Sequence, residues 1–152
     1  MRIREKMPAI PGAATWINHE VSREELIGEK PTLVHFWSVS CDICKEALPV
    51  INGFRDAFKN KLNLLAVHLP LSEEDLDIEQ VKVIAKRYNI TQPIFVDNRH
   101  QLTDAFANEY VPAYYLFDTE GRLRHYQAGE HRLKRLEKRV HRILEENKNG
   151  LF

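Results

Sequence analysis

The stretch Thr32-Leu33-Val34-His35-Phe36-Trp37-Ser38-Val39-Ser40-Cys41-Asp42-Ile43-Cys44 decides the fold of this chain. Its first six residues form an apolar, aromatic run typical of a buried strand, and a helical pattern begins at Cys41. Cys41 and Cys44 are the only two cysteines in the sequence. A CxxC motif at the start of a helix that follows a buried strand is typical of a redox-active dithiol. We therefore predict that Cys41 is the nucleophile and that Cys44 resolves the mixed disulfide.

The position of Cys41 predicts the more acidic of the two thiols. Backbone N–H groups and the helix dipole stabilise a thiolate at a helix start, which lowers its pKa. Cys44 lies one turn further along, so the pair can close into a disulfide with little backbone movement. We predict that Asp42 opposes a neighbouring thiolate and that Lys45 partly offsets this effect. The alternative is that Asp42 is solvated and changes the potential little.

The composition predicts one globular domain over residues 1–152, with 43% hydrophobic and 29% charged residues. The formal net charge of +0 argues against nucleic acid or an anionic membrane as the main partner. Residues 1–8 contain no apolar stretch of signal-peptide length, and no later segment could span a bilayer. If Met1 is the true start, we expect a cytoplasmic monomer. A secreted chain trimmed of its leader would have the same sequence.

Hydrophobic periodicity predicts a mixed α/β sheet with helices on both faces. Residues 1–15 form an irregular lead-in, and Ser22 with Glu25 indicates a capped helix over 23–28. We expect Pro49 to kink the helix that starts at Cys41, and Ser72 with Asp75 to cap a later one. The remaining expected elements are strands at 32–37, 62–69 and 93–96, a helix at 100–108, a hairpin of 113–117 and 123–127 around Gly121, and a basic helix at 132–146.

The cysteines leave a metal-binding alternative open. A structural zinc site needs four ligands, whereas one CxxC supplies two, and none of the seven histidines has finger-like spacing to it. We therefore predict no bound metal. A copper chaperone remains a rival because His68 or His125 could supply a further ligand, although such proteins usually have a CxxxC. A passive interaction domain with ordinary thiol reactivity is a third interpretation.

The segment Val34 to Lys45, followed by Pro49 and later by Tyr110-Val111-Pro112-Ala113, resembles the thioredoxin fold. Within that fold the chain resembles the bacterial TlpA/ResA-like thiol–disulfide oxidoreductases over nearly its whole length. The helix–strand unit at about 72–97 is similar to the insertion typical of that subgroup. The resemblance implies a thioredoxin-like fold: a mixed central sheet, helices on both faces and this inserted unit.

The resemblance also implies how a substrate would bind. Pro112 would be cis and face the cysteines, and the backbone of Val111 would pair with a substrate strand. Gly129 matches a glycine that lines the same groove. We assign Trp37 and Ile43 to the same substrate-binding surface.

Two positions depart from the family pattern. Thioredoxin has a buried Asp six residues before the first cysteine, where this chain has His35. His35 could exchange a proton with Cys44, since histidine titrates near neutrality, or it could be a hydrogen-bonded core residue. ResA-like proteins have a functional Glu three residues after the second cysteine, where this chain has Ala47. The adjacent Glu46 is turned by about 100° on the helix, so it does not replace that Glu.

The favoured interpretation is a thiol–disulfide oxidoreductase that reduces protein disulfides. Its partners would be disulfide-containing proteins and a thiol electron donor, and the two cysteines would hold the electrons without a bound cofactor. A thiol peroxidase is the nearest enzymatic rival. Peroxiredoxins have Pro and Thr at fixed positions before the reactive cysteine, where this chain has Val34 and Ser38.

Overall fold

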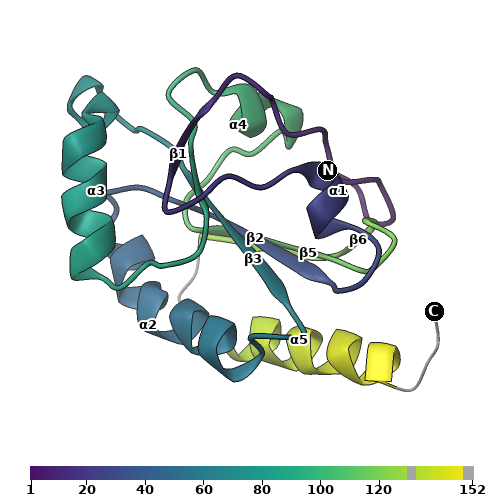
Figure 1. The fold of residues 1–152 in the computed structure, drawn as a ribbon. Helices are drawn as coiled ribbons and strands as arrows, with labels where there is room; N and C mark the ends of the chain where they lie inside the picture. Colours follow the sequence, from purple (N-terminus) through teal and green to yellow (C-terminus); the bar gives the residue numbers. More distant parts are fainter. Residues whose placement is uncertain (130–132, 149–152) are drawn as a thin grey trace.

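The computed structural model describes residues 1–129 and 133–148, which form a central sheet with helices on both faces (Figure 1). The described residues build a six-stranded sheet in the order β1-β4-β3-β2-β5-β6. In chain order the elements are β1 Thr15–Ile17, α1 Arg23–Leu26, β2 Thr32–Trp37, α2 Asp42–Ala57, β3 Asn63–His68, the 3-10 turn η1 Glu73–Leu76, α3 Ile78–Arg87, β4 Ile94–Val96, α4 Gln101–Ala105, β5 Ala113–Phe117, β6 Leu123–Ala128 and α5 Leu133–Lys148.

Strand β2 forms the centre of the core because all six of its residues are buried. Its side chains alternate between the two faces of the sheet. Val34 and Phe36 pack with the N-terminal segment, α1 and α4 on one face. Leu33 packs with α2 and α5, and Trp37 packs with α2 and α3, on the other face. The predicted arrangement of helices on both faces is confirmed (Figure 1).

The register of the central strands brings two loops together. β2 pairs in parallel with β3, and Trp37 lies opposite His68 at their carboxyl ends. β2 pairs antiparallel with β5, so that Phe36 lies opposite Ala113 at the start of that strand. The loops that follow β2 and β3 therefore leave the sheet side by side, next to the segment that leads into β5.

Most predicted elements are present, with shifts of a few residues at their ends. The Ser22 capping box is formed, although the helix ends at Leu26. Helix α2 includes Pro49 within one continuous helical span. The last helix begins at Leu133, and the predicted start at Arg132 lies outside the described residues. Within the described ranges no helix combines the length and the apolar character needed to cross a bilayer.

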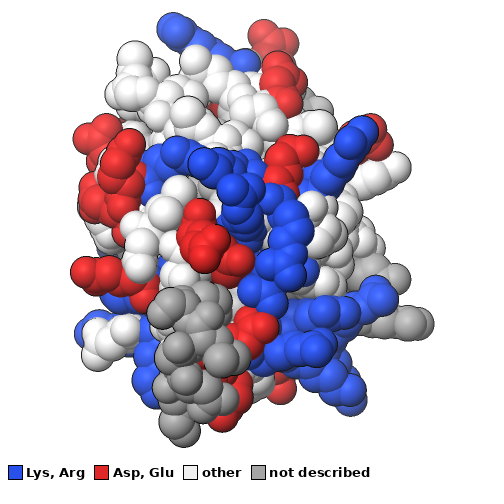
Figure 2. Space-filling view, turned by 90° about the vertical axis from the view of Figure 1, so that its right-hand side faces the viewer, with Lys and Arg blue, Asp and Glu red and all other residues white. Residues whose placement is uncertain are grey.

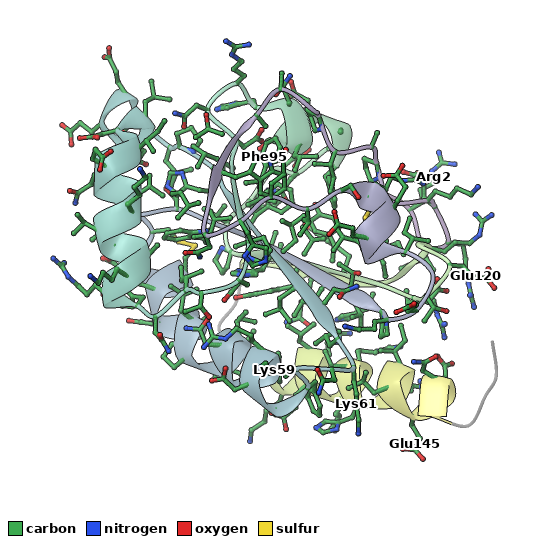
Figure 3. All side chains as sticks on the ribbon, viewed as in Figure 1. Arg2, Lys59, Lys61, Phe95, Glu120 and Glu145 are labelled. Carbon is green, nitrogen blue, oxygen red and sulfur yellow. A yellow bond between two sulfur atoms is a disulfide. The ribbon has the colours of Figure 1, made fainter. Side chains whose placement is uncertain are left out.

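The expected irregular lead-in is wrong at its end, because it runs into strand β1. Thr15 to Ile17 pair antiparallel with β4 at the edge of the sheet. The ring of Trp16 packs edge-on against that of Phe95, which is labelled in Figure 3, with 5.2 Å between ring centroids. A strand of three residues gives too short an alternation to be recognised in the sequence.

The expected cap at Ser72 and Asp75 is also wrong. Ser72 precedes only the turn η1 and makes no side-chain cap hydrogen bond. Helix α3 begins after Asp77, whose carboxylate accepts hydrogen bonds from the N–H groups of Glu79 and Gln80. Asp75 is thereby free to bond elsewhere. Residues 72–97 form η1, α3 and β4, and their description as an inserted unit stays a prediction.

The hairpin glycine gives a test of the fold. Gly121 has a φ of 76°, and an added Cβ would lie 2.6 Å from a side-chain carbon of Ile27. We expect Gly121→Ala to lower the free energy of unfolding by about 1–3 kcal/mol, from backbone strain and crowding. Urea denaturation measures this change.

The matched control is Gly53→Ala, in the interior of α2 where an added Cβ meets nothing within 4 Å. This change should stabilise the protein by about 0.5–1 kcal/mol, because alanine is the better helix former. Equal effects of the two substitutions would contradict the hairpin geometry.

Candidate active site

Cys41 and Cys44 form a disulfide at the start of α2, with 5.3 Å between their Cα atoms. In Figure 3 it is the yellow sulfur–sulfur bond on the side of the molecule where α2 and α3 lie. Cys41 is the N-cap residue of α2, and its Sγ accepts a hydrogen bond from the Cys44 N–H at 3.2 Å. Cys41 is partly exposed, whereas Cys44 is only 2% exposed. A substrate can therefore reach Cys41 before Cys44.

The two charged neighbours of the cysteines pair with each other on the surface. Lys45 Nζ lies 3.6 Å from an Asp42 carboxylate oxygen, and the Asp42 side chain is 91% exposed. A charge so fully solvated has a strongly screened effect on a nearby thiolate. This geometry favours the alternative in which Asp42 changes the potential little.

A buried carboxylate, which the sequence analysis assigned to a helix cap, holds the loop before Cys41. Asp75 is 4% exposed, and one of its oxygens accepts hydrogen bonds from Ser40 Oγ at 2.6 Å and Ser38 Oγ at 3.1 Å. The same oxygen accepts the N–H of Leu71 at 2.9 Å. Asp75 thus joins the loop after β2 to the loop after β3.

Asp75 is linked to the residue next to Cys41 by a hydrogen bond from the Ser40 hydroxyl. Burial acts to raise its pKa, but the hydrogen bonds from Ser40, the Leu71 N–H and Ser38 outweigh burial and hold the pKa below its usual range. The carboxylate is therefore ionised at neutral pH. It contacts Ser40, the residue immediately before the nucleophile.

His68 supports the same loop from the end of β3. Its Nε2 accepts a hydrogen bond from the Val39 N–H at 3.2 Å. A ring nitrogen that accepts has no proton, so this ring is the neutral form protonated on Nδ1. Burial lowers the pKa of His68 to about 4, although the charge of Asp75 acts in the opposite direction. His68 is fully buried and acts as a fixed acceptor for the loop.

His35 has a comparable arrangement behind the active site. Arg55 Nη1 donates to Gln92 Oε1 at 2.9 Å, which turns the Gln92 amide nitrogen toward His35. That nitrogen lies 3.0 Å from His35 Nε2, and an amide NH₂ can only donate. Nε2 must accept, so the ring is neutral, and complete burial lowers its pKa to about 3.

This result bears on the two alternatives for His35, proton exchange with Cys44 and a hydrogen-bonded core residue. A ring with a pKa of about 3, bonded to Gln92, is a poor partner for proton exchange with Cys44 at physiological pH. The geometry favours the other alternative, a core histidine satisfied by a hydrogen bond.

The Val111–Pro112 peptide bond is cis, as the resemblance implied. Val111 and Cys41 both pack against the apolar cluster that includes Cys44. The Val111 backbone has no hydrogen-bond partner among the described residues. The Gly129 N–H donates a hydrogen bond to the Pro112 carbonyl at 2.8 Å. Gly129 itself has a φ of 71°. Among the described residues the Val111 backbone therefore remains unpaired, on the same apolar cluster as the nucleophile.

The two side chains assigned to substrate binding differ in their exposure. Ile43 is 44% exposed next to the cysteines, which is consistent with contact to a substrate. Trp37 is 1% exposed, so the expectation that it touches substrate is wrong. Its ring is buried with α2 and α3, and it packs edge-on against His68 with 5.1 Å between ring centroids.

The structure brings together no metal-ligand set among the residues it describes: no cluster there has three or more histidine, cysteine or acidic side chains able to hold an ion. His68 uses Nε2 for the Val39 N–H. His125, the other candidate ligand, bonds Gln127 at 2.8 Å.

The fold and the CxxC disulfide at a helix start, beside a cis-proline, define the class of thioredoxin-like thiol–disulfide oxidoreductases. Sequence comparison gives the family: the AhpC/TSA family matches residues 3–126, and the chain belongs to it. The thiol–disulfide oxidoreductase YkuV of Bacillus subtilis is 60% identical over 146 residues, which are 96% of this chain and 99% of YkuV. The predicted resemblance is confirmed, and the chain is a thiol–disulfide oxidoreductase.

Two further similarities agree with this assignment. The solution structure of a thioredoxin-like protein in the oxidized form superposes with a TM-score of 0.89 at 60% identity, covering 96% of this chain and 99% of that one. The protein DipZ of Mycobacterium tuberculosis is 31% identical over 95% of this chain, which corresponds to 21% of the length of DipZ.

His35 and His68 predict a loss of stability in mild acid, and His125, whose pKa is also lowered by burial, acts in the same direction. Well above pH 6.5 the rings of His35 and His68 are neutral in both the folded and the unfolded chain. Below that pH the unfolded chain binds a proton on each ring. The folded protein does so only near its own pKa values, about 3 for His35 and about 4 for His68. Stability therefore falls as pH falls through this window, by about 2 kcal/mol per histidine between pH 7 and 5.

Denaturant unfolding at several pH values measures the effect. His35→Gln should remove about 2 kcal/mol of the loss, whereas His19→Gln, which replaces an exposed ring, should remove less. A stability that does not fall between pH 7 and 5 would contradict the neutral, buried state of both rings.

Proposed function

We propose that this protein reduces disulfides in other proteins. The Cys41 thiolate attacks one sulfur of the substrate disulfide, forms a mixed disulfide and releases the other substrate thiolate. Cys44 then attacks Cys41 Sγ, closes the intramolecular disulfide and releases the second thiolate. Two electrons pass to the substrate, and a thiol donor restores the dithiol, so no bound cofactor is required.

The observation on which the direction rests is the charge around Cys41. The Cys44 N–H, which bonds the sulfur, and the helix start would both stabilise a Cys41 thiolate. The ionised carboxylate of Asp75 accepts a hydrogen bond from the adjacent Ser40 and acts against the thiolate. A nearby negative charge disfavours the thiolate, and a dithiol whose thiolate is weakly stabilised is a stronger reductant. The charge of Asp42 is 91% exposed and screened by water, so it adds little.

The substrate would bind along the backbone of Val111, which has no hydrogen-bond partner among the described residues. An extended segment pairing there adds main-chain hydrogen bonds, while Ile43 supplies apolar contact beside the nucleophile. Gly129, exposed next to Pro112, leaves room for the segment because it has no side chain. A reductant of this kind suits the cytoplasm, where thiols are kept reduced.

The reduction potential tests the proposed direction. We expect a value nearer to thioredoxin, at about −270 mV, than to DsbA, at about −120 mV. Equilibration of the full chain in dithiothreitol redox buffers, with the thiols counted by alkylation and mass spectrometry, gives the value.

Asp75→Asn keeps an acceptor oxygen but removes the charge. The thiolate then becomes more stable, so the potential should rise by an amount on the order of 10–30 mV. Asp42→Asn is the matched control, and its exposed charge should matter less. A wild-type potential close to that of DsbA, or a larger shift in Asp42→Asn, would contradict the proposal.

A further inference from the structure

A hollow lies at the end of the molecule away from the cysteines. It has a volume of about 240 Å³ and is formed by the N-terminal segment, β5, β6 and α5. Figure 3 labels Arg2, Glu120 and Glu145 at this end, opposite the disulfide. The residues that line the hollow are Ile3, Arg4, Leu116, Arg124, His125, Arg139, Arg142, Ile143 and Glu146.

Arginine is the dominant charge of this hollow. Four arginines line it, against one carboxylate, Glu146. That carboxylate is already used: Arg124 Nη2 donates to both of its oxygens, at 2.8 and 3.0 Å. Arg124 also lies 3.5 Å from Asp118. Among the described residues Arg4, Arg139 and Arg142 form no ion pair, so the hollow keeps an excess of positive charge.

This excess stands out because the whole chain has a formal net charge of +0. Figure 2 shows Lys and Arg side chains in a band across this end of the molecule. The pKa of His125, in the wall of the hollow, is lowered chiefly by burial and also by Arg139 and Arg135, although its hydrogen bond to Gln127 acts in the opposite direction. Like charges around one hollow repel each other and lower stability unless an anion joins them.

The backbone of Arg4, in the wall of the hollow, is also strained. Arg4 has a φ of 76°, a left-handed conformation that is costly for a residue with a side chain. Two hydrogen bonds hold it there: its N–H donates to the Leu123 carbonyl at 2.7 Å, and Arg122 Nη1 donates to its carbonyl at 3.1 Å. Residues far apart in the sequence are thus fixed around one positive hollow.

We infer that this hollow is a binding site for a phosphate-bearing anion, with a diphosphate group as the chemistry it fits. Guanidinium groups bind phosphate oxygens through paired N–H donors, and three of these arginines have that capacity free. A volume of about 240 Å³ is below the roughly 300–1,000 Å³ of pockets that enclose drug-sized ligands. The group can be free pyrophosphate or the terminal phosphates of a larger molecule. The site is separate from the dithiol, so it does not depend on the direction of electron transfer.

The test is titration of the oxidised full chain with inorganic pyrophosphate, followed by calorimetry and by amide chemical shifts. We expect saturable binding with a dissociation constant on the order of 0.1–1 mM, weakening as salt is added. The largest shifts should map to Arg4, β6 and the second half of α5. The double variant Arg139→Gln, Arg142→Gln should bind at least about tenfold more weakly, since each lost charge-assisted pair is costly.

Arg87→Gln on α3 is the matched control, because it removes an exposed arginine far from the hollow and should leave the affinity unchanged. The double variant should keep wild-type disulfide exchange, which shows that it is folded. A parallel titration with ADP distinguishes free pyrophosphate from the terminal phosphates of a larger molecule. Equal affinity of ADP at the same residues assigns the site to terminal phosphates. No binding of ADP assigns it to the free anion. Failure of both anions to saturate, equal weakening in Arg87→Gln, or tighter binding of a poly-glutamate peptide at these arginines would overturn the inference.

Discussion

The Asp75 carboxylate ties together the two loops on which the active site is built. Parallel pairing of β2 and β3 ends with Trp37 opposite His68, so both chains leave the sheet at one place. Both loops need partners for their polar groups there, and a single buried oxygen accepts from Ser38, Ser40 and the Leu71 N–H. Without that oxygen the buried Ser38 hydroxyl, the Ser40 hydroxyl and the Leu71 N–H would lose a shared acceptor.

The hydrogen bonds to Asp75 have a chemical as well as a structural consequence. They fix the loop so that Cys41 caps α2 and its sulfur receives the Cys44 N–H. They also keep an ionised carboxylate hydrogen-bonded to Ser40, the residue before the sulfur that must become negative. A helix start favours a thiolate and a nearby negative charge disfavours it, and we propose that this balance suits a thiol that gives up electrons. His68 and His35 contribute as neutral acceptors, since burial removes their proton at physiological pH.

The parts of this account that local sequence determines could be predicted. The run from Thr32 to Trp37 and the CxxC at 41–44 specify a buried strand, a helix start and a dithiol, and Gly121 marks the hairpin. Contacts across the fold could not be predicted. Asp75 is one of several acidic residues between 72 and 79, and only the register of β3 selects it as the partner of Ser40. Trp37 alternates to the α2 face and is buried there, although its position next to the motif suggested exposure.

The protonation state of His35 could not be predicted from the sequence either. Its place on a central strand predicted burial, but its protonation depends on Gln92, which is far away in the sequence and is turned by Arg55. The four arginines of the hollow come from the N-terminus, β6 and α5 and have no common motif. Each of these groups becomes visible only when the sheet has brought distant segments together.

The most direct test of the central claim is the pKa of each thiol in the reduced protein. Alkylation rates measured across pH, with the modified residue identified by mass spectrometry, report the two thiols separately. Cys41 should react first as the pH is raised, because it is the N-cap of α2 and the more accessible sulfur. A lower pKa or faster alkylation at Cys44 would contradict the placement of Cys41 as the nucleophile held by this loop.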